Sequence, residues 1–281
     1  MEAPIGLIAG EGTLPVITAQ GIAAHGRRVA CVGLHHQYGP DLPRHCDRFN
    51  TAGVVQFGRW IRLLRGWGVR EAVMVGGVRK DRIYKPFFLF HQLPDWRAVR
   101  MWFGTLRHDK RTDVMLRAVA DTLSVEGIEL VDSTQYIPEQ MADAGPMTRQ
   151  RPSGAQQKDI DFALPIIQQI GRLDIGQAIT VRECEVIAVE AVEGTDRLIE
   201  RTGQLCPRGG WTLVKIAKPT QDMRLDVPAV GLTTLEKIKA AGGACLALEA
   251  GKVIMLEKTQ MIAAAEKAGL AIVGLEMARG Q

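Results

Sequence analysis

The sequence predicts an α/β protein of two domains, a Rossmann-like N-terminal domain with a parallel sheet and a C-terminal α/β domain. Short apolar runs alternate with helix-like stretches along the chain, and such alternation is typical of parallel sheets with right-handed crossovers. The length of 281 residues is long for one core and sufficient for two. Residues 141–154 are rich in Gly, Pro and polar residues, which predicts a linker.

The predicted boundaries are residues 1–140 for the N-terminal domain, 141–155 for the linker and 156–281 for the C-terminal domain. The charge distribution agrees with them. Residues 1–135 hold 18 Lys+Arg and 13 Asp+Glu, whereas the remainder holds 17 and 18, and all six histidines precede residue 110. The two halves therefore differ in character.

In the first half, apolar runs bounded by glycine predict buried strands, and apolar residues at helical spacing predict helices that end at glycines. The expected strands are 4–9, 28–34, 72–75 and 128–131, and the expected helices are 15–25, 57–67 and 113–126. The same rules give the second half. Its expected helices are 156–170, 196–202, 233–241 and 259–267, and its expected strands are 180–192, 212–217, 244–248, 253–256 and 270–274.

Composition favours a cytoplasmic protein of a reducing compartment. No stretch approaches the roughly 20 apolar residues that span a bilayer, and the first residues lack the basic region of a signal peptide. The five cysteines are scattered and include no CxxC pair, so neither a disulfide framework nor a zinc site is predicted. A GxSxG nucleophile motif is also absent from the sequence.

Two glycine turns follow predicted strands of the first half. Gly10-x-Gly12 precedes a helix that starts near Leu14, and glycines at such a place let a phosphate approach the helix N-terminus. The dinucleotide fingerprint would need a third glycine where Pro15 stands. Gly76-Gly77 ends another strand at the same edge of the sheet, where open α/β sheets bind ligands. Tight turns without a ligand are the alternative interpretation of both.

Residues 79–111 combine aromatic and basic side chains. They hold nine Lys+Arg, three Asp+Glu and seven of the fifteen aromatic residues of the chain. This mixture suits an acyl chain or a membrane surface, and packing between domains or protomers is the alternative. Aromatic and basic residues also occur together in single-stranded nucleic-acid sites, but the sequence contains no nucleic-acid motif, so no such partner is expected.

Carboxylates cluster at two places in the second half. Glu190, Glu193 and Asp196 surround a glycine turn, where Thr195 or Asp196 is expected to cap the next helix. Alternation along an extended chain would place Asp222, Arg224 and Asp226 on one side. Such carboxylates suit Mg²⁺ or Mn²⁺, and an arginine suits charge developing on a phosphoryl group. Helix caps and solvated surface charges are the alternative.

Five motifs in order carry a family resemblance. They are Gly6-Leu-Ile-Ala-Gly10-x-Gly12-x-Leu14-Pro15, Asp174-Ile-Gly176-Gln177, Glu190-Ala-Val-Glu193-Gly194-Thr195-Asp196, Lys218-Pro219-x-Gln221-x-x-Arg224-x-Asp226-x-Pro228-x-x-Gly231 and Glu249-Ala-Gly251. The chain resembles the LpxI-type UDP-2,3-diacylglucosamine pyrophosphatase family over nearly its whole length.

The resemblance implies metal-dependent hydrolysis of UDP-2,3-diacylglucosamine, bound between two domains, to UMP and 2,3-diacylglucosamine 1-phosphate. Asp226 matches the essential aspartate of the family, and Gly10 and Gly12 match its nucleotide-side loop. One departure concerns Asp113, because Thr112 stands where relatives often have another acid.

The resulting hypothesis assigns a role to each candidate residue. Asp226 and Arg224 are expected to be catalytic, and Asp226, Asp196 and Glu193 to bind Mg²⁺ or Mn²⁺. The expected substrate-binding residues are Gly10, Gly12, Leu14, Gly76, Asp113, Gln177, Glu190, Thr195 and Gln221. The expected partners are a UDP-linked diacylated sugar lipid, the inner membrane through peripheral contact, and a second copy of the chain in a homodimer.

Two other hypotheses stay open at this point. A non-catalytic nucleotide-sugar or lipid-binding protein on the same scaffold would tolerate the loss of Asp226, because fold does not fix function. An NAD(P)-dependent enzyme is disfavoured by Pro15 and by the missing third glycine.

Overall fold

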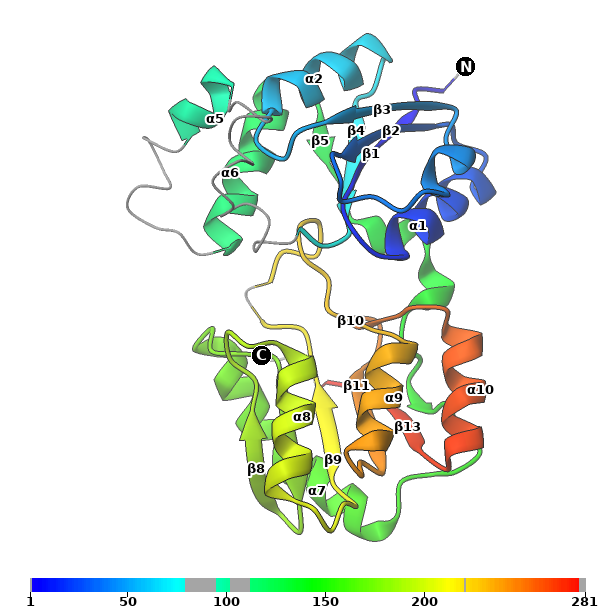
Figure 1. The fold of residues 1–281 in the computed structure, drawn as a ribbon, viewed down its shortest axis with the longest axis vertical. Helices are drawn as coiled ribbons and strands as arrows, with labels where there is room; N and C mark the ends of the chain where they lie inside the picture. Colours follow the sequence, from blue (N-terminus) through cyan, green and yellow to red (C-terminus); the bar gives the residue numbers. More distant parts are fainter. Residues whose placement is uncertain (1, 79–94, 102–111, 220, 278–281) are drawn as a thin grey trace. The chain divides into compact units, whose positions relative to one another are not determined.

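The computed structural model describes residues 2–78, 95–101, 112–219 and 221–277, without the side chains of 99–101, 112 and 113. The chain forms two compact units, each with its own sheet (Figure 1). The first unit comprises Met1–Pro138 together with Asp222–Asp226, and the second comprises Glu139–Gln221 and Val227–Gln281. Five residues from the second half of the sequence thus belong to the first unit, which no pattern in the sequence predicts.

The first unit contains a five-stranded sheet in the order β3-β2-β1-β4-β5, and all of its neighbouring strands are parallel. Its strands are β1 (Ile5–Ala9), β2 (Val29–Leu34), β3 (Arg48–Ala52), β4 (Glu71–Val75) and β5 (Glu129–Leu130). This order confirms the predicted Rossmann-like parallel sheet. The sequence analysis missed β3, in which half-exposed and exposed residues alternate.

Helices cover both faces of this sheet. The described helices are α1 (Leu14–Ala24), α2 (Phe57–Gly66), α5 (Trp96–Met101) and α6 (Thr112–Val125), and the short 3-10 turns are η1 (Leu42–His45) and η3 (Ser133–Tyr136). One core cluster joins α2 and α6 to Ile8 and Val32, and the other joins α1 to Leu7 and Cys31 on the opposite face. Helix α2 buries Phe57, Trp60, Ile61 and Leu64, which recur at helical spacing.

The second unit contains a six-stranded mixed sheet in the order β6-β13-β11-β9-β7-β8. The central strands β9, β11 and β13 are parallel, whereas β6, β7 and β8 join antiparallel. The strands are β6 (Gly145–Pro146), β7 (Ala178–Arg182), β8 (Glu185–Val189), β9 (Thr212–Lys215), β11 (Cys245–Glu249) and β13 (Ala271–Leu275). A separate parallel pair is formed by β10 (Ala229–Val230) and β12 (Ile254–Met255).

Helices also cover both faces of the second sheet. They are α7 (Gly154–Arg172), α8 (Thr195–Leu205), α9 (Leu232–Ala240) and α10 (Lys258–Ala268). Apolar residues of α7 pack on one face, and those of α8, α9 and α10 pack on the other, where these three helices lie side by side (Figure 1). The start of α7 is a capping box, in which Ser153 Oγ accepts from Gln156 N and Gln156 Oε1 accepts from Ser153 N.

The prediction of one strand over residues 180–192 is wrong. The segment belongs to a hairpin of β7 and β8, and the turn between them places Glu183 and Cys184 at φ 54° and 59°. The turn carries none of the glycines or asparagines that usually mark such conformations. Instead, the buried Asp159 on α7 accepts a hydrogen bond from Cys184 N at 2.8 Å and stabilises the turn through a tertiary contact.

Residues 141–155, predicted as a linker, are folded with the second unit. Met141 and Ala142 are buried, and Ala142 N donates to Val253 O at 2.9 Å. The strand β6 within this segment pairs with β13. The short 3-10 turn η4 (Pro138–Gln140) precedes it, at the point where the chain passes from the first unit to the second.

Candidate active site

The two glycine turns of the first unit lie side by side at the carboxyl ends of β1 and β4. Glu11 N donates to Gly77 O at 2.7 Å, and Gly77 N donates to Glu11 O at 3.0 Å. A Cβ on Gly10 would stand 2.5 Å from Gly77 O, and one on Gly76 would stand 2.8 Å from Glu11 O. The prediction that both glycine turns lie at the same edge of the sheet is therefore confirmed. Gly10 and Gly76 have no room for a side chain, because the two turns pack against each other.

Gly12 and Leu14 stand where α1 begins. Gly12 is exposed with φ 103°, and a Cβ there would meet no atom within 4 Å. The N-cap Thr13 makes no side-chain cap hydrogen bond, and Pro15 occupies the first turn of the helix. The N-terminus of α1 thus has no side-chain cap, and its dipole favours an anion.

Asp113 lies in the first turn of α6, and its side chain is outside the described residues. The same applies to most of segment 79–111, which was expected to meet an acyl chain or a membrane. Within that segment, Asp95 is described, and its carboxylate accepts from Gly58 N and Ala98 N. Trp96 exposes 77% of its surface.

Residues 222–226 form a turn, so the expected extended chain with alternating side chains is wrong. Asp222 O accepts from Leu225 N at 2.9 Å and from Asp226 N at 3.1 Å. The Asp222 carboxylate accepts from Arg224 N at 3.0 Å and binds the Arg224 guanidinium through Nε and Nη2 at 3.0 and 2.7 Å. An aspartate that binds the backbone two residues on starts a turn rather than a strand.

The Arg224 hydrogen bond is the main cause that lowers the pKa of Asp222, and the charge of Arg117 on α6 acts in the same direction. Arg224 and Asp226 are exposed on this turn, whereas Leu225 between them is buried. The structure therefore brings the two expected catalytic residues, Asp226 and Arg224, together on one exposed turn of the first unit.

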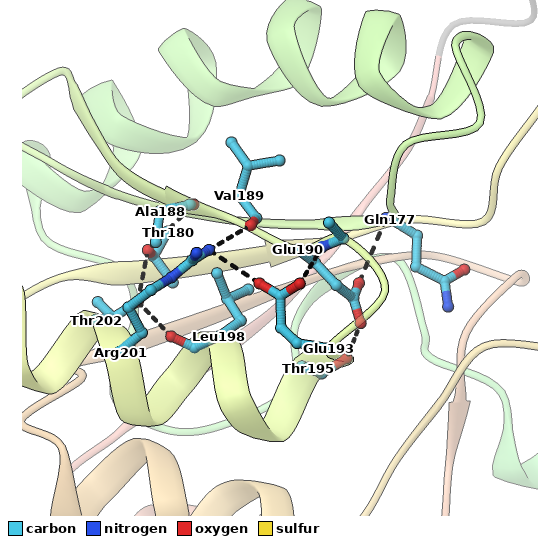
Figure 2. Close-up of polar contacts among 11 residues, drawn as sticks. Gln177, Thr180, Ala188, Val189, Glu190, Glu193, Thr195, Leu198, Arg201 and Thr202 are labelled. Atoms are coloured by element: carbon cyan, nitrogen blue, oxygen red, sulfur yellow. Dashed lines mark hydrogen bonds and ion pairs between the residues drawn. The ribbon is translucent and has the colours of Figure 1, made fainter. Parts of the chain in front are cut away.

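Glu190 and Thr195 belong to a buried network of the second unit (Figure 2). Thr195 Oγ1 donates to Glu190 Oε1 at 2.8 Å, and Lys215 Nζ donates to Thr195 Oγ1 at 2.9 Å and to Ala229 O at 3.0 Å. Glu190 and Lys215 are each only 5% exposed. Burying a charge is costly unless it is paired or hydrogen-bonded, so the network offsets the cost of both ions.

The expected helix cap at Thr195 or Asp196 is wrong. Gly194, at φ 82°, is the N-cap residue of α8 and has no side chain to bond the first turn. Thr195 turns its hydroxyl to Glu190 instead. The orientation of the Thr195 hydroxyl cannot be read from the local sequence. It depends on Lys215, which donates to Thr195 Oγ1 from a strand that follows α8 in the chain.

The two glutamines expected to bind substrate have different surroundings. Gln177 N donates to Glu190 Oε2 at 3.4 Å, and the Gln177 side chain points away from the Glu190 carboxylate (Figure 2). Gln177 Oε1 is buried without a hydrogen-bond partner among the described residues. Gln221 Oε1 accepts from Lys218 N at 3.0 Å and closes a local turn.

Two of the carboxylates expected to bind a metal are paired with cations. Glu193 forms an ion pair with Arg201 at 3.0 Å (Figure 2), and Asp196 forms one with Lys237 at 2.9 Å. Asp226 belongs to the first unit. In the part of the chain that the structure describes, no group of three His, Cys, Asp or Glu residues could hold a metal ion.

Two charged residues of the second unit escaped the sequence analysis as candidates. Lys215 ends β9, and Glu249 ends β11, so both lie at the carboxyl edge of the parallel strands. Glu249 Oε2 accepts from Ala217 N at 2.8 Å, and burial raises the pKa of its carboxyl group. For both residues the signal in the sequence was a charged residue that ends an apolar run, and Glu249 also stood in the motif Glu249-Ala-Gly251.

The class that these observations define is an α/β protein of two units, with a glycine turn at the edge of a parallel sheet in one unit and buried charged side chains at the edge of a mixed sheet in the other. Family models match both halves, the LpxI N-terminal domain over residues 4–140 and the LpxI C-terminal domain over residues 143–273. The chain therefore belongs to the LpxI family.

A protein of Caulobacter vibrioides is 33% identical in an alignment of 280 residues that covers 97% of each chain, and it is named UDP-2,3-diacylglucosamine pyrophosphatase LpxI. Solved structures give only distant likenesses. A biotin carboxylase complex from Campylobacter jejuni matches at TM-score 0.24 and 11% identity, over 74% of this chain and 43% of its own. A biotin carboxylase domain of a single-chain bacterial carboxylase matches at TM-score 0.22 and 15% identity, over 73% and 55%. These scores support no structural argument.

Proposed function

We propose that this chain hydrolyses the diphosphate of UDP-2,3-diacylglucosamine to UMP and 2,3-diacylglucosamine 1-phosphate, a reaction of lipid A biosynthesis. The observation that carries the proposal is the relative of that name, which matches 97% of the chain. Both family domains are present in this chain. The proposal therefore rests on the whole chain and not on one shared domain.

Asp226 is proposed as the catalytic carboxylate, either as a base for the attacking water or as a ligand of a metal ion. It is exposed, and its position is fixed by the hydrogen bond from its own N–H to Asp222 O. Arg224 is proposed to neutralise charge on the diphosphate. A guanidinium has five N–H donors, and Asp222 engages Nε and Nη2, so the Nη1 side is the part that the ion pair does not occupy.

A divalent ion, Mg²⁺ or Mn²⁺, is proposed as the cofactor. Mg²⁺ is commonly held by one or two carboxylates together with substrate phosphates, and the exposed Asp226 fits that donor set. Glu193 and Asp196 are proposed as further ligands, and a metal ion would replace their ion pairs with Arg201 and Lys237. When bound, such an ion offsets the charge of the diphosphate and lowers the pKa of a bound water.

The start of α1 is proposed as a binding site for the nucleotide diphosphate. Gly12 and Leu14 would contact the ligand, while Gly10 and Gly76 shape the turn that carries them. Asp113, Gln177, Glu190, Thr195 and Gln221 remain proposed substrate-binding residues. Among them, Gln177 has the strongest support, since its buried side-chain oxygen has no partner in the described residues.

The substrate class also suggests where the protein works. A diacylated sugar lipid resides in a membrane, so we propose a cytoplasmic protein that contacts the inner membrane peripherally. None of the described helices is long and apolar enough to span a bilayer. Segment 79–111, with its aromatic and basic residues, is proposed to make this contact, and a homodimer is proposed as well.

The test is UMP release from UDP-2,3-diacylglucosamine by the purified chain with Mg²⁺ or Mn²⁺, and with a chelator. Asp226→Asn should lower the rate about 100-fold or more if the carboxylate acts on water or metal. Glu236→Gln, on the exposed surface of α9, is a matched control that should leave the rate unchanged. Tight substrate binding without any UMP release would support the non-catalytic alternative and contradict the proposal.

A further inference from the structure

Residues 222–226 are embedded in the first unit although the chain on both sides belongs to the second. Leu225 is the only one of the five that is buried, at 9% exposure, and it belongs to the core cluster that α2 and α6 build on the sheet. Its neighbours Arg224 and Asp226 are exposed. Leu225 is therefore the apolar side chain that anchors this turn in the core of the first unit.

The turn itself is internally stiff. Asp222 O binds the N–H groups of Leu225 and Asp226, and the Asp222 carboxylate binds both the backbone and the guanidinium of Arg224. Because these bonds couple Arg224, Leu225 and Asp226 to Asp222, a shift of Leu225 would move Asp226 with it.

The chain is fixed on both sides of the turn within the second unit. Before it, Ala217 N donates to Glu249, and Lys218 Nζ forms an ion pair with Asp174 at 2.7 Å. After it, Pro228 O accepts from Ile254 N at 2.8 Å, and β10 pairs with β12. The flanking bonds thus hold residues 217 and 228, whereas Leu225 packs into the core of the first unit.

We propose that Leu225 is a positioning residue, which sets the orientation of the Asp226 carboxylate by anchoring the 222–226 turn in the core of the first unit. The inference deepens the proposed function and depends on the role of Asp226 given there. Catalytic groups need placement to a fraction of an ångström, and a displacement of about 1 Å can lower a rate about 100-fold.

Leu225→Ala tests the anchor. We expect kcat for UMP release to fall about 10-fold to 100-fold with KM changed less than about threefold, and Leu225→Met, which conserves volume, to restore most of it. Leu123→Ala is the matched control, since Leu123 lies in the same core cluster at 1% exposure. It should lower the melting temperature and leave kcat unchanged at temperatures where it is folded.

Hydrogen exchange gives a readout that does not depend on activity. The amides of Leu225 and Asp226 should exchange faster in Leu225→Ala than in the wild type, and Leu225→Met should restore their protection, because both amides bond to Asp222 O. Unchanged protection, or equal loss of kcat in Leu225→Ala and Leu123→Ala, would overturn the anchor. An Asp226→Asn variant that keeps full activity would instead overturn the proposed role of Asp226, whatever the exchange data show.

Discussion

The carboxyl edges of the sheets in the two units differ in the groups that form them. In the first unit, the carboxyl edge of β1 and β4 is made of backbone, since the turns at Gly10 and Gly76 bond to each other. In the second unit, the corresponding edge of β9 and β11 carries charged side chains, Lys215 and Glu249. The close packing of the first edge requires that these positions carry no side chain. The stability of the second edge requires that each buried charged group keeps its hydrogen-bond partners.

Among the changes that test this difference, removal of Lys215 should have the largest effect on the free energy of unfolding. Lys215→Met removes the donor that binds Thr195 Oγ1 and Ala229 O, and each buried polar group left without its partner costs about 1–3 kcal/mol. Urea unfolding would measure the loss. Lys218→Met is the matched control, because its ion pair with Asp174 is partly exposed and is worth about 1 kcal/mol or less. Equal losses for the two variants would show that the network does not stabilise the second unit.

A methyl group at Gly76 should have the next largest effect. Gly76→Ala forces a Cβ to within 2.8 Å of Glu11 O at φ 91°, so we expect a loss of about 2 kcal/mol from strain and overpacking. Gly77→Ala is the control at the next position, because its Cβ meets no atom within 4 Å. Thermal unfolding of the pair compares them directly, and the edge is not closely packed if Gly76→Ala melts like Gly77→Ala.

Much of the fold was predictable, because helix and strand periods are local properties of the sequence. The apolar spacing in α2 and the glycine turn after β1 are examples, and both are found where expected. The hairpin at Glu183 and Cys184 was not predictable, since a buried aspartate on a distant helix stabilises it. In the candidate site, too, features set by local sequence were predictable and features set by tertiary contacts were not.

Asp226 and Arg224 lie in one motif, and the structure places them on one turn. The turn conformation was missed, because alternation of charges along the sequence resembles a strand. Lys215 was missed because its partners, Thr195 and Ala229, lie 20 and 14 residues away in the sequence. Networks of buried side chains depend on tertiary contacts that no local pattern encodes.

The smallest expected effect is a difference in pH dependence between the units. Burial raises the pKa of Glu249 above its ordinary value, so the folded state binds this proton more tightly than the unfolded state. The contribution of Glu249 to stability is therefore full below the ordinary carboxyl pKa and is lost as pH rises through the raised pKa. Glu249→Gln should flatten this decline in melting temperature above about pH 4.

Asp222 in the first unit has the opposite sign. Arg224 lowers its pKa, so its contribution is present above the ordinary carboxyl pKa and is lost as pH falls through the lowered pKa. Asp222→Asn should therefore reduce the acid sensitivity of the melting temperature. If both variants changed the pH profile in the same direction, the contrast between the two carboxylates would be refuted.

The five residues of the second half of the sequence that belong to the first unit also restrict where the chain can be cut into fragments. The LpxI C-terminal domain model spans residues 143–273 and includes Leu225, yet Leu225 packs in the core of the first unit. A fragment cut at the family boundary would expose that leucine to water and leave a vacancy in its former neighbours. A chimera of two relatives would likewise place the turn of one parent against the core of the other, so we expect such a chimera to be stable when the leucine and the core residues around it come from the same parent.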